Sequence, residues 1–161
     1  MTIIDINKDL AALFEQQAAA TPDAVALEDE KRSLTYAELD RETWALAERL
    51  RNHGVGRDDL VGVLMGRSAD YVIASVAALR AGGAFLVLEV AYPPGLLRDV
   101  IEDAKPTVIL TQVEHASHIK SDVPVIVVDH PDKEARGDIT PQLDERRPLP
   151  EEDDVERLAF V

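Results

Sequence analysis

Hydrophobic residues along the chain alternate between a helical period and continuous runs of the kind that form buried strands. Such runs predict strands over 60–64, 84–88, 107–110 and 124–128. Between them, apolar residues at helical spacing predict one helix that begins at Ser68 or Asp70 and another that begins at Pro93-Pro94. Apolar strands that alternate with amphipathic helices are typical of parallel sheets covered on both faces. We therefore expect an α/β fold, doubly wound or close to it, in which helices flank a mostly parallel sheet.

The N-terminal part of the chain precedes this alternation and predicts different elements. Leucine and phenylalanine at helical spacing predict a helix over 8–20, which Thr21-Pro22-Asp23 ends. Two short segments, 24–28 and 32–35, flank the polar turn Asp29-Glu30-Lys31. This arrangement predicts a β-hairpin.

A second helix has sequence signals at both of its ends. Thr35 and Glu38 have the spacing of a capping box, in which each side chain accepts a hydrogen bond from the backbone of the other residue. Gly54 can adopt the positive φ that follows the end of a helix. We expect Trp44 to cover a neighbouring element. The face that we expect to be buried carries Leu39, Thr43, Leu46, Ala47 and Leu50.

The composition of the 161-residue chain argues against several classes of function. Asp and Glu number 31 against 17 Lys and Arg, giving a formal net charge of −14, and such acidity repels nucleic acids and anionic lipids. The chain has no cysteine, which excludes disulfides, thiol catalysis and Cys-ligated zinc. No apolar run is long enough to span a bilayer, and Met1–Asp5 lacks the basic start of a signal peptide. We expect a cytoplasmic protein that binds neither nucleic acid nor membrane.

Half of the net charge lies in one segment near the C-terminus. Residues 129–156 hold 11 acidic and 4 basic residues, several prolines and almost no periodic apolar pattern. We interpret this acidic, proline-containing segment as a long, solvated connection. The alternative is a docking surface for a basic partner. Residues 158–161 then resemble the start of one more strand.

Candidate chemistry in such a fold lies just beyond the carboxyl ends of the strands. Arg67 follows the strand 60–64 near a helix N-terminus, where an anion could bind, but a surface arginine beside a helix cap fits the same sequence. Gly82-Gly83 follows a helix and precedes a strand, a position that favours a helix C-cap over a phosphate loop. The sequence contains no GxGxxG or GxxxxGK[ST] motif, and therefore neither a dinucleotide fingerprint nor a P-loop.

Other residues of reactive types lack the spacing that their chemistry requires. His115 and His118, in a short helix or loop over 112–120, could share a helical face, but a solvent-exposed pair is the favoured interpretation over a metal site. Glu151–Asp154 has adjacent carboxylates without the spaced ligands and glycine of a calcium loop. We assign no catalytic, cofactor-binding or metal-ligating residue. No GxSxG motif, the mark of a serine nucleophile, surrounds Ser68, Ser75, Ser117 or Ser121.

Several segments in series match motifs of one known family. Residues 34–39 fit the motif L-[TS]-Y-x-E-L, and residues 79–89 are similar to L-K-A-G-x-A-Y-x-P-x-D. The other matching segments are 13–18, 21–27, 91–94, 103–106 and 108–111. In this order and spacing they resemble the N-terminal part of amino-acid adenylation domains from nonribosomal peptide synthetases. That family belongs to the acyl-adenylate-forming, AMP-dependent synthetase/ligase superfamily, and the resemblance covers nearly the whole chain.

The resemblance implies the N-terminal subdomain of the adenylate-forming fold. It also implies a parent enzyme of secondary metabolism that converts an amino acid and ATP to aminoacyl-AMP and pyrophosphate, using Mg²⁺. Transfer to the phosphopantetheine thiol of a carrier protein would follow. The chain departs from the second motif at Val87, Glu89 and Val90, where proline, aspartate and proline are usual. The turn that leaves this strand can therefore differ in geometry.

In the family, a strand similar to 158–161 leads into the Ser/Thr/Gly-rich loop that holds the ATP phosphates, and the catalytic residues lie further on. No position of this chain matches them. We therefore expect residues 1–161 to be a truncated N-terminal part of an adenylation domain that binds no cofactor and is not catalytic alone. Its partners would be the remainder of the domain or synthetase and a downstream carrier protein.

Two other interpretations stay open. A free-standing, truncated, non-catalytic module would cover its apolar surface by forming a homodimer or by docking on a synthetase. A fragment of an acyl-CoA synthetase is the other, although the segments 21–26 and 91–94 favour the peptide-synthetase branch. The amino-acid substrate cannot be read from this sequence, because the resemblance places the specificity pocket outside it.

Overall fold

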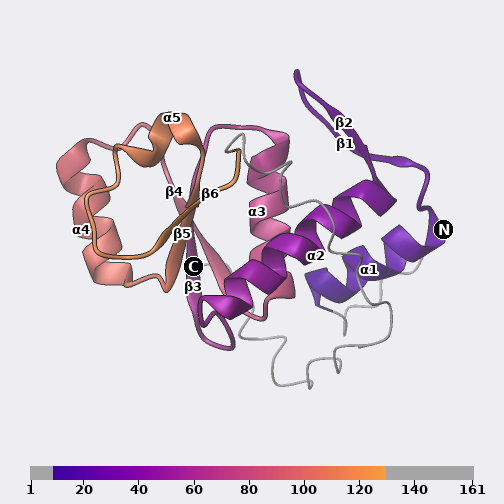
Figure 1. The fold of residues 1–161 in the computed structure, drawn as a ribbon, viewed down its shortest axis with the longest axis horizontal. Helices are drawn as coiled ribbons and strands as arrows, with labels where there is room; N and C mark the ends of the chain where they lie inside the picture. Colours follow the sequence, from indigo (N-terminus) through magenta and orange to yellow (C-terminus); the bar gives the residue numbers. More distant parts are fainter. Residues whose placement is uncertain (1–8, 130–161) are drawn as a thin grey trace.

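A computed structural model describes residues 9–129 as alternating helices and strands (Figure 1). Within this range, no helix is long and apolar enough to cross a membrane. The elements in chain order are α1 (Leu10–Ala20), β1 (Val25–Glu28), β2 (Ser33–Thr35), α2 (Tyr36–Asn52), β3 (Leu60–Leu64), α3 (Ala69–Arg80), β4 (Ala84–Leu88), α4 (Pro94–Ala104), β5 (Val108–Thr111), α5 (Val113–Ala116) and β6 (Val125–Val127).

The strands form two separate sheets. β1 and β2 make a two-stranded antiparallel hairpin, and the other strands make one parallel sheet in the order β4-β3-β5-β6. Val61 of β3 lies between Phe85 of β4 and Val108 of β5, which fixes the register at the centre of the sheet. Figure 1 shows α4 on one side of the sheet, with α3, α2 and α1 on the other, and the hairpin projecting beyond them.

Successive side chains of the strands point to opposite faces and feed two separate cores. The face toward α2 and α3 carries Val61, Val63, Val108 and Leu110. The face toward α4 carries Leu64, Leu88 and Ile109, which pack with Leu97 and Ile101 of that helix. A Cβ added to Gly62 would lie 3.1 Å from side-chain atoms of both Leu88 and Ile109, so glycine permits this close packing. The two cores explain why the strands are apolar along their whole length.

Local signals explain where the helices begin and end. The capping box of α2 is formed as predicted: Glu38 N donates to Thr35 Oγ1 at 3.2 Å, and Thr35 N donates to the Glu38 carboxylate at 2.8 Å. α3 begins directly after Ser68, whose hydroxyl accepts from Tyr71 N. Beyond the other end of α3, Gly82 has a φ of +97°, as expected for a glycine that ends a helix.

The predicted α/β fold, the hairpin and the order of the elements are confirmed. The predicted inner face of α3, with Val72, Ser75, Val76 and Leu79, is partly wrong. Val72 and Val76 are only half-buried, whereas the fully buried positions include Ile73, Ala74, Ala77 and Ala78. The small alanines lie inside because they let neighbouring elements approach α3 closely. The expected helix or loop over 112–120 contains one short helix, α5. Residues 130–156 of the acidic segment, the carboxylates 151–154 and the strand expected at 158–161 lie outside the described residues.

Candidate functional site

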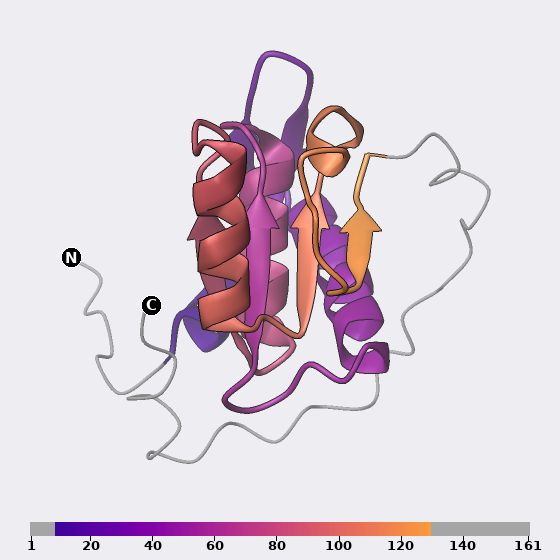
Figure 2. The ribbon, with the colours of Figure 1, turned by 90° about the vertical axis from the view of Figure 1, so that its left-hand side faces the viewer.

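The carboxyl ends of β3 and β5 are where a ligand is expected in this sheet. The chain passes from β3 to β4 on one side and then crosses back to β5 on the other side of β3, so the strand order reverses there. In open parallel sheets, ligands bind beyond the carboxyl ends of the strands at such a switch point. Figure 2 shows the strand arrows pointing toward the end of the molecule from which the hairpin projects.

Polar groups from both central strands meet at this switch point. The Ser68 hydroxyl, just before α3, donates to the carbonyl oxygen of Gly66 at 3.2 Å, and Gln112 Nε2 lies 3.4 Å from the same hydroxyl. Gln112 follows β5 and is buried. Thr111 Oγ1 donates to the Leu64 carbonyl at 2.8 Å and ties the last residues of β5 and β3 together. The two strand ends are therefore joined by side chains of the chain itself.

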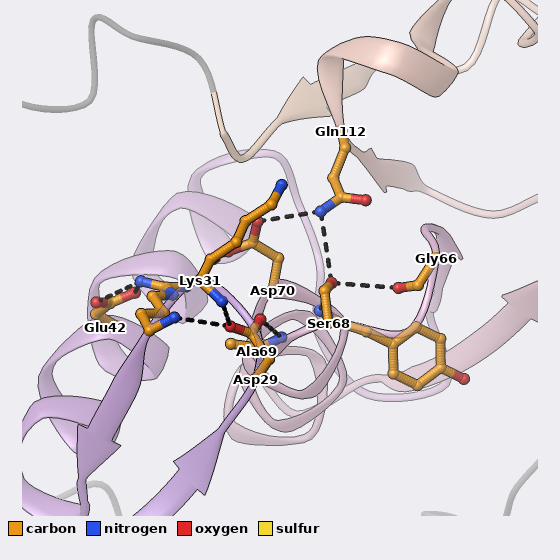
Figure 3. A network of polar contacts seen from close by, with 10 residues as sticks. Asp29, Lys31, Glu42, Gly66, Ser68, Ala69, Asp70 and Gln112 are labelled. Atoms are coloured by element: carbon orange, nitrogen blue, oxygen red, sulfur yellow. Dashed lines mark hydrogen bonds and ion pairs between the residues drawn. The ribbon is translucent and has the colours of Figure 1, made fainter.

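The turn of the hairpin reaches the same point through Asp29 (Figure 3). Asp29 Oδ2 accepts from Ala69 N, the first N–H of α3, at 2.7 Å. Its other oxygen accepts from Lys31 N at 2.8 Å and Arg32 N at 2.9 Å, which closes the turn. The first N–H groups of a helix have no partner within the helix and attract anions. The Asp29 carboxylate is thus the anion at the N-terminus of α3.

Arg32 adds ion pairs from the hairpin to two helices. Its Nη1 lies 3.0 Å from Glu42 Oε1 of α2, and its Nη2 lies 2.7 Å from Asp70 Oδ1 of α3. The other oxygen of Asp70 accepts from Gln112 Nε2 at 3.2 Å. Asp70 therefore links the hairpin to the residue that follows β5. We call Asp29, Arg32, Glu42, Ser68, Asp70 and Gln112 the switch-point network.

Backbone donors control the charge of Asp29. The N–H groups of Ala69, Arg32 and Lys31, in that order, lower the pKa of its carboxyl group below the usual aspartate range, and the Arg32 charge adds to this effect. Hydrogen bonds to the charged form of an acid favour that form. Asp29 is therefore ionised at neutral pH, which suits an internal cap of α3.

The sequence candidates lie at the edge of this arrangement or outside it. Arg67 is exposed, next to a helix N-terminus that Asp29 already occupies. Gly82-Gly83 ends α3 and packs against the chain before β3, since a Cβ on Gly83 would lie 2.8 Å from the Asp59 carbonyl oxygen. This is the structural position that the sequence favoured.

The histidine pair differs in part from the expectation. His118 is exposed, as predicted, but the His115 side chain is only 13% exposed, and its Nε2 lies 3.3 Å from Glu114 Oε1. The prediction of an exposed pair is therefore wrong for His115, because the one-turn helix α5 turns this ring inward. Within residues 9–129, no group of three or more His, Asp or Glu side chains could hold a metal ion.

Sequence reasoning missed the switch-point network as a unit. Asp29 had a usable signal, because an aspartate that begins a polar turn often accepts from the N–H groups two and three positions on. Arg32, Asp70 and Gln112 had none, since they lie 38 to 42 positions from the partners that bring the network together.

Comparisons with known proteins agree with this architecture. The family model for AMP-binding enzymes matches residues 14–161. Glycine betaine reductase ATRR of Emericella nidulans is 59% identical over 161 residues, 100% of this chain. Tyrocidine synthase 1 of Brevibacillus parabrevis is 39% identical over 134 residues, 81% of this chain. The nonribosomal peptide synthetase FmoA3, solved with α-methyl-L-serine-AMP bound, is 34% identical with a TM-score of 0.70, over 73% of this chain and 14% of that one.

The open parallel sheet and its N-terminal hairpin thus have the architecture of adenylation domains. The chain belongs to the AMP-binding enzyme family and corresponds to the N-terminal portion of an adenylation domain of the nonribosomal peptide synthetase type. The resemblance seen in the motifs is confirmed. The chain spans 12% of the length of each of the two curated relatives named above.

Proposed function

We propose that residues 1–161 form a structural part of an ATP-dependent enzyme that activates a carboxylic acid, and that they do no chemistry alone. In that reaction a carboxylate oxygen attacks the α-phosphorus of ATP, an acyl-AMP anhydride forms and pyrophosphate leaves. Family membership and the solved relative that holds α-methyl-L-serine-AMP support this reaction class. The amino-acid adenylate bound to the peptide synthetase FmoA3 supports an amino acid as the substrate, with transfer to a carrier protein as the step that would follow.

The observation that carries the structural role is the filled switch point. The Asp29 carboxylate occupies the first N–H of α3, and the side chains of Asp70, Ser68 and Gln112 bind one another. A triphosphate at this point would meet the negative charges of Asp29, Glu42 and Asp70, and like charges at short range repel strongly. The residues present therefore do not fit ATP.

Magnesium does not fit this site either. Mg²⁺ requires oxygen ligands in near-octahedral geometry and usually shares them with substrate phosphates. Asp70 already accepts from Arg32 and Gln112, and Glu42 already accepts from Arg32. ATP and Mg²⁺ are accordingly assigned to the remainder of the enzyme, and we route no chemical step through this chain.

The test is ATP–pyrophosphate exchange with the purified 161-residue chain and a panel of amino acids that includes glycine betaine. The expected result is exchange at the background of the enzyme-free reaction. The matched control is the reductase ATRR assayed with glycine betaine. Exchange by the chain alone that depends on an added acid would overturn the structural role.

The similarity to ATRR favours a second use of the same activation step. Identity is 59% to this reductase and 39% to tyrocidine synthase 1. A carboxylate resists reduction until it is activated, so formation of an acyl-AMP is a suitable first step for a reductase. In an enzyme that contains this chain, a hydride donor such as NAD(P)H would then reduce the activated acyl group as its leaving group departs, giving an aldehyde, or an alcohol after a second hydride transfer. Product analysis distinguishes this outcome from the amide bond of a peptide synthetase.

Exposed apolar side chains favour a third role, a non-catalytic module that dimerises or docks on a synthetase. Val25 is 61% exposed, Val113 52% and Leu10 51%. Size-exclusion chromatography with light scattering separates the cases. A dimer of the isolated chain would favour the module, and a monomer that remains monomeric at high concentration would count against it.

A further inference from the structure

The hairpin is attached to the rest of the chain in two different ways. At its base, Leu34 is 6% exposed and Leu27 packs half-buried against the core beneath α2 and α3. At its tip, Glu28, Glu30, Lys31 and Ser33 are exposed. The attachments of the tip are the polar contacts of Asp29 and Arg32. Apolar packing thus holds the base, and charge holds the tip.

The hairpin has little stability of its own. β1 and β2 contain 4 and 3 residues, form their own sheet and have a register shift between Val25 and Leu27. An isolated two-stranded hairpin is marginal in water. The position of the tip therefore depends on its contacts with α2 and α3.

The contacts of the tip converge on the N-terminus of α3. The N–H of Ala69 finds its partner in Asp29, 40 positions away in the sequence. Arg32 reaches Asp70, the next residue of α3, and Asp70 passes the contact on to Gln112 beyond β5. The turn of the hairpin is thereby linked through the start of α3 to the residue that follows β5, as Figure 3 shows for the labelled residues.

We propose that residues 28–33 are a latch over the switch point, closed by Asp29 and Arg32. The latch opens when the tip leaves α3 while the base of the hairpin, the sheet and the helices stay folded. Opening exposes Ser68, Asp70 and Gln112 at the carboxyl ends of β3 and β5. This local opening costs little free energy because it breaks half-exposed polar contacts and leaves the core packing intact. The latch is independent of the reaction that the whole enzyme performs.

Amide hydrogen exchange at Ala69, read by NMR in the 161-residue chain, tests the latch. Because the Asp29 carboxylate is the partner of this N–H, the amide becomes free to exchange when the tip lifts. Arg32→Gln should speed exchange at Ala69 by about two- to fivefold, since its half-exposed ion pairs make only a modest contribution to closure. In the wild type, amides within β3 and β5 should exchange far more slowly than Ala69, because they report opening of the sheet.

Glu30→Gln is the matched control, since it removes a charge from the same turn at an exposed position. It should leave the Ala69 rate unchanged. A wild-type measurement at rising NaCl concentration needs no substitution: screening weakens the half-exposed Arg32 pairs and should also speed exchange at Ala69. The latch is refuted if Arg32→Gln leaves Ala69 as protected as before. It is equally refuted if Ala69 is as protected as the sheet amides in the wild type, since the tip then moves only with global unfolding.

Discussion

Helix α3 is held by charged side chains at both ends, but the two ends are built differently. At its C-terminal end, the Arg80 side chain is 5% exposed and contacts α1 and α2. At its N-terminal end, Asp70 binds Arg32 of the hairpin, whose side chain is 31% exposed. Each arginine pairs with two carboxylates, so the chemistry is the same and the burial differs.

The buried end is fixed from several directions. Arg80 Nη1 donates to the side chain of Asp40 at 2.8 Å and to Thr43 Oγ1 at 2.9 Å, and Nη2 lies 3.3 Å from Glu15. The guanidinium carbon lies 5.5 Å from the centre of the Phe14 ring and 5.2 Å from that of Trp44. This contact is how Trp44 covers a neighbouring element, as the sequence led us to expect.

The difference in burial separates two kinds of stability. A charge buried in the core is costly to leave unpaired, so contacts of Arg80 affect the free energy of unfolding of the whole domain. A half-exposed ion pair contributes little to global stability because water screens it. The network around Arg32 therefore affects mainly the local closure of the hairpin.

The largest effect is expected for Asp40→Ala. Removing this carboxylate leaves the buried Arg80 still paired with Glu15 at 3.3 Å but without its nearer ion pair to Asp40. Loss of one partner of a buried pair costs roughly 3–5 kcal/mol, and the half-exposed position of Asp40 places this case at the lower end of that range. Urea denaturation followed by circular dichroism measures the loss.

A double variant sharpens this prediction. Adding Arg80→Met to Asp40→Ala removes the charge that was left buried and keeps an apolar chain beside Phe14 and Trp44. Part of the stability should return, because apolar replacements of buried ions are often neutral or stabilising. A double variant less stable than Asp40→Ala would show that desolvation of Arg80 is not the dominant cost.

The next effect concerns the glycines just beyond the buried end. In Gly83→Ala, the new Cβ would lie 2.8 Å from the Asp59 carbonyl oxygen and 3.0 Å from Val55 Cγ1. The Asp59 carbonyl is fixed by Ala84 N at 2.9 Å, so the backbone cannot easily move away. Overpacking of this kind costs about 2 kcal/mol.

Gly95→Ala is the matched control for the glycine prediction. Gly95 lies in α4, and nothing is within 4 Å of the position its Cβ would take. Alanine there should stabilise the chain by about 0.5 kcal/mol, because it restricts the unfolded state. Equal thermal shifts in the two variants would contradict the packing role of Gly83.

A smaller global effect is expected for Arg32→Gln. The ion pairs of Arg32 are half-exposed, and pairs of this kind contribute about 0.5–1 kcal/mol. The same denaturation experiment should therefore show a small change in the urea midpoint, in keeping with an about two- to fivefold faster exchange at Ala69. A loss of unfolding free energy as large as that of Asp40→Ala would show that the two ends of α3 contribute equally to global stability, contrary to this account.

Lowering the pH tests the contacts at the half-exposed, N-terminal end of α3 without any substitution. Since its folded pKa is lowered, Asp29 stabilises the closed latch fully above the unfolded aspartate pKa of about 3.9 and loses this contribution as pH falls through the folded value. The amide shift of Ala69 should titrate with Asp29, with a midpoint below about 3.9. A midpoint at or above that value would contradict the contact. The charged groups around Asp29 are Glu30, Lys31, Arg32, Glu42 and Asp70.

Local sequence signals predicted the parts of the fold that depend on neighbouring residues. The capping box of Thr35 and Glu38 and the glycine at 82 lie within one helical turn of the groups they serve, so spacing alone identified them. The inner face of α3 was misread because its buried residues are mostly alanines, which carry a weaker hydrophobic signal than Val72 and Val76.

The site could not be predicted in the same way. Asp29 and Arg32 meet α3 only after the sheet, the helices and the hairpin are assembled, so no short spacing encodes their contacts. The same holds for Arg80, whose family motif marks the end of a helix and gives no sign of a buried charge. The motifs thus identify the local caps and turns, whereas the long-range polar contacts are seen only in the structure.

The most direct test of the structural role is a chimera in which this chain replaces the matching 161-residue alignment of ATRR. A scaffold that only completes the adenylation domain should preserve glycine-betaine-dependent ATP–pyrophosphate exchange at a rate comparable to that of ATRR, while the chain alone shows none. A chimera that folds but has lost exchange, or a chain that exchanges by itself, would contradict the account.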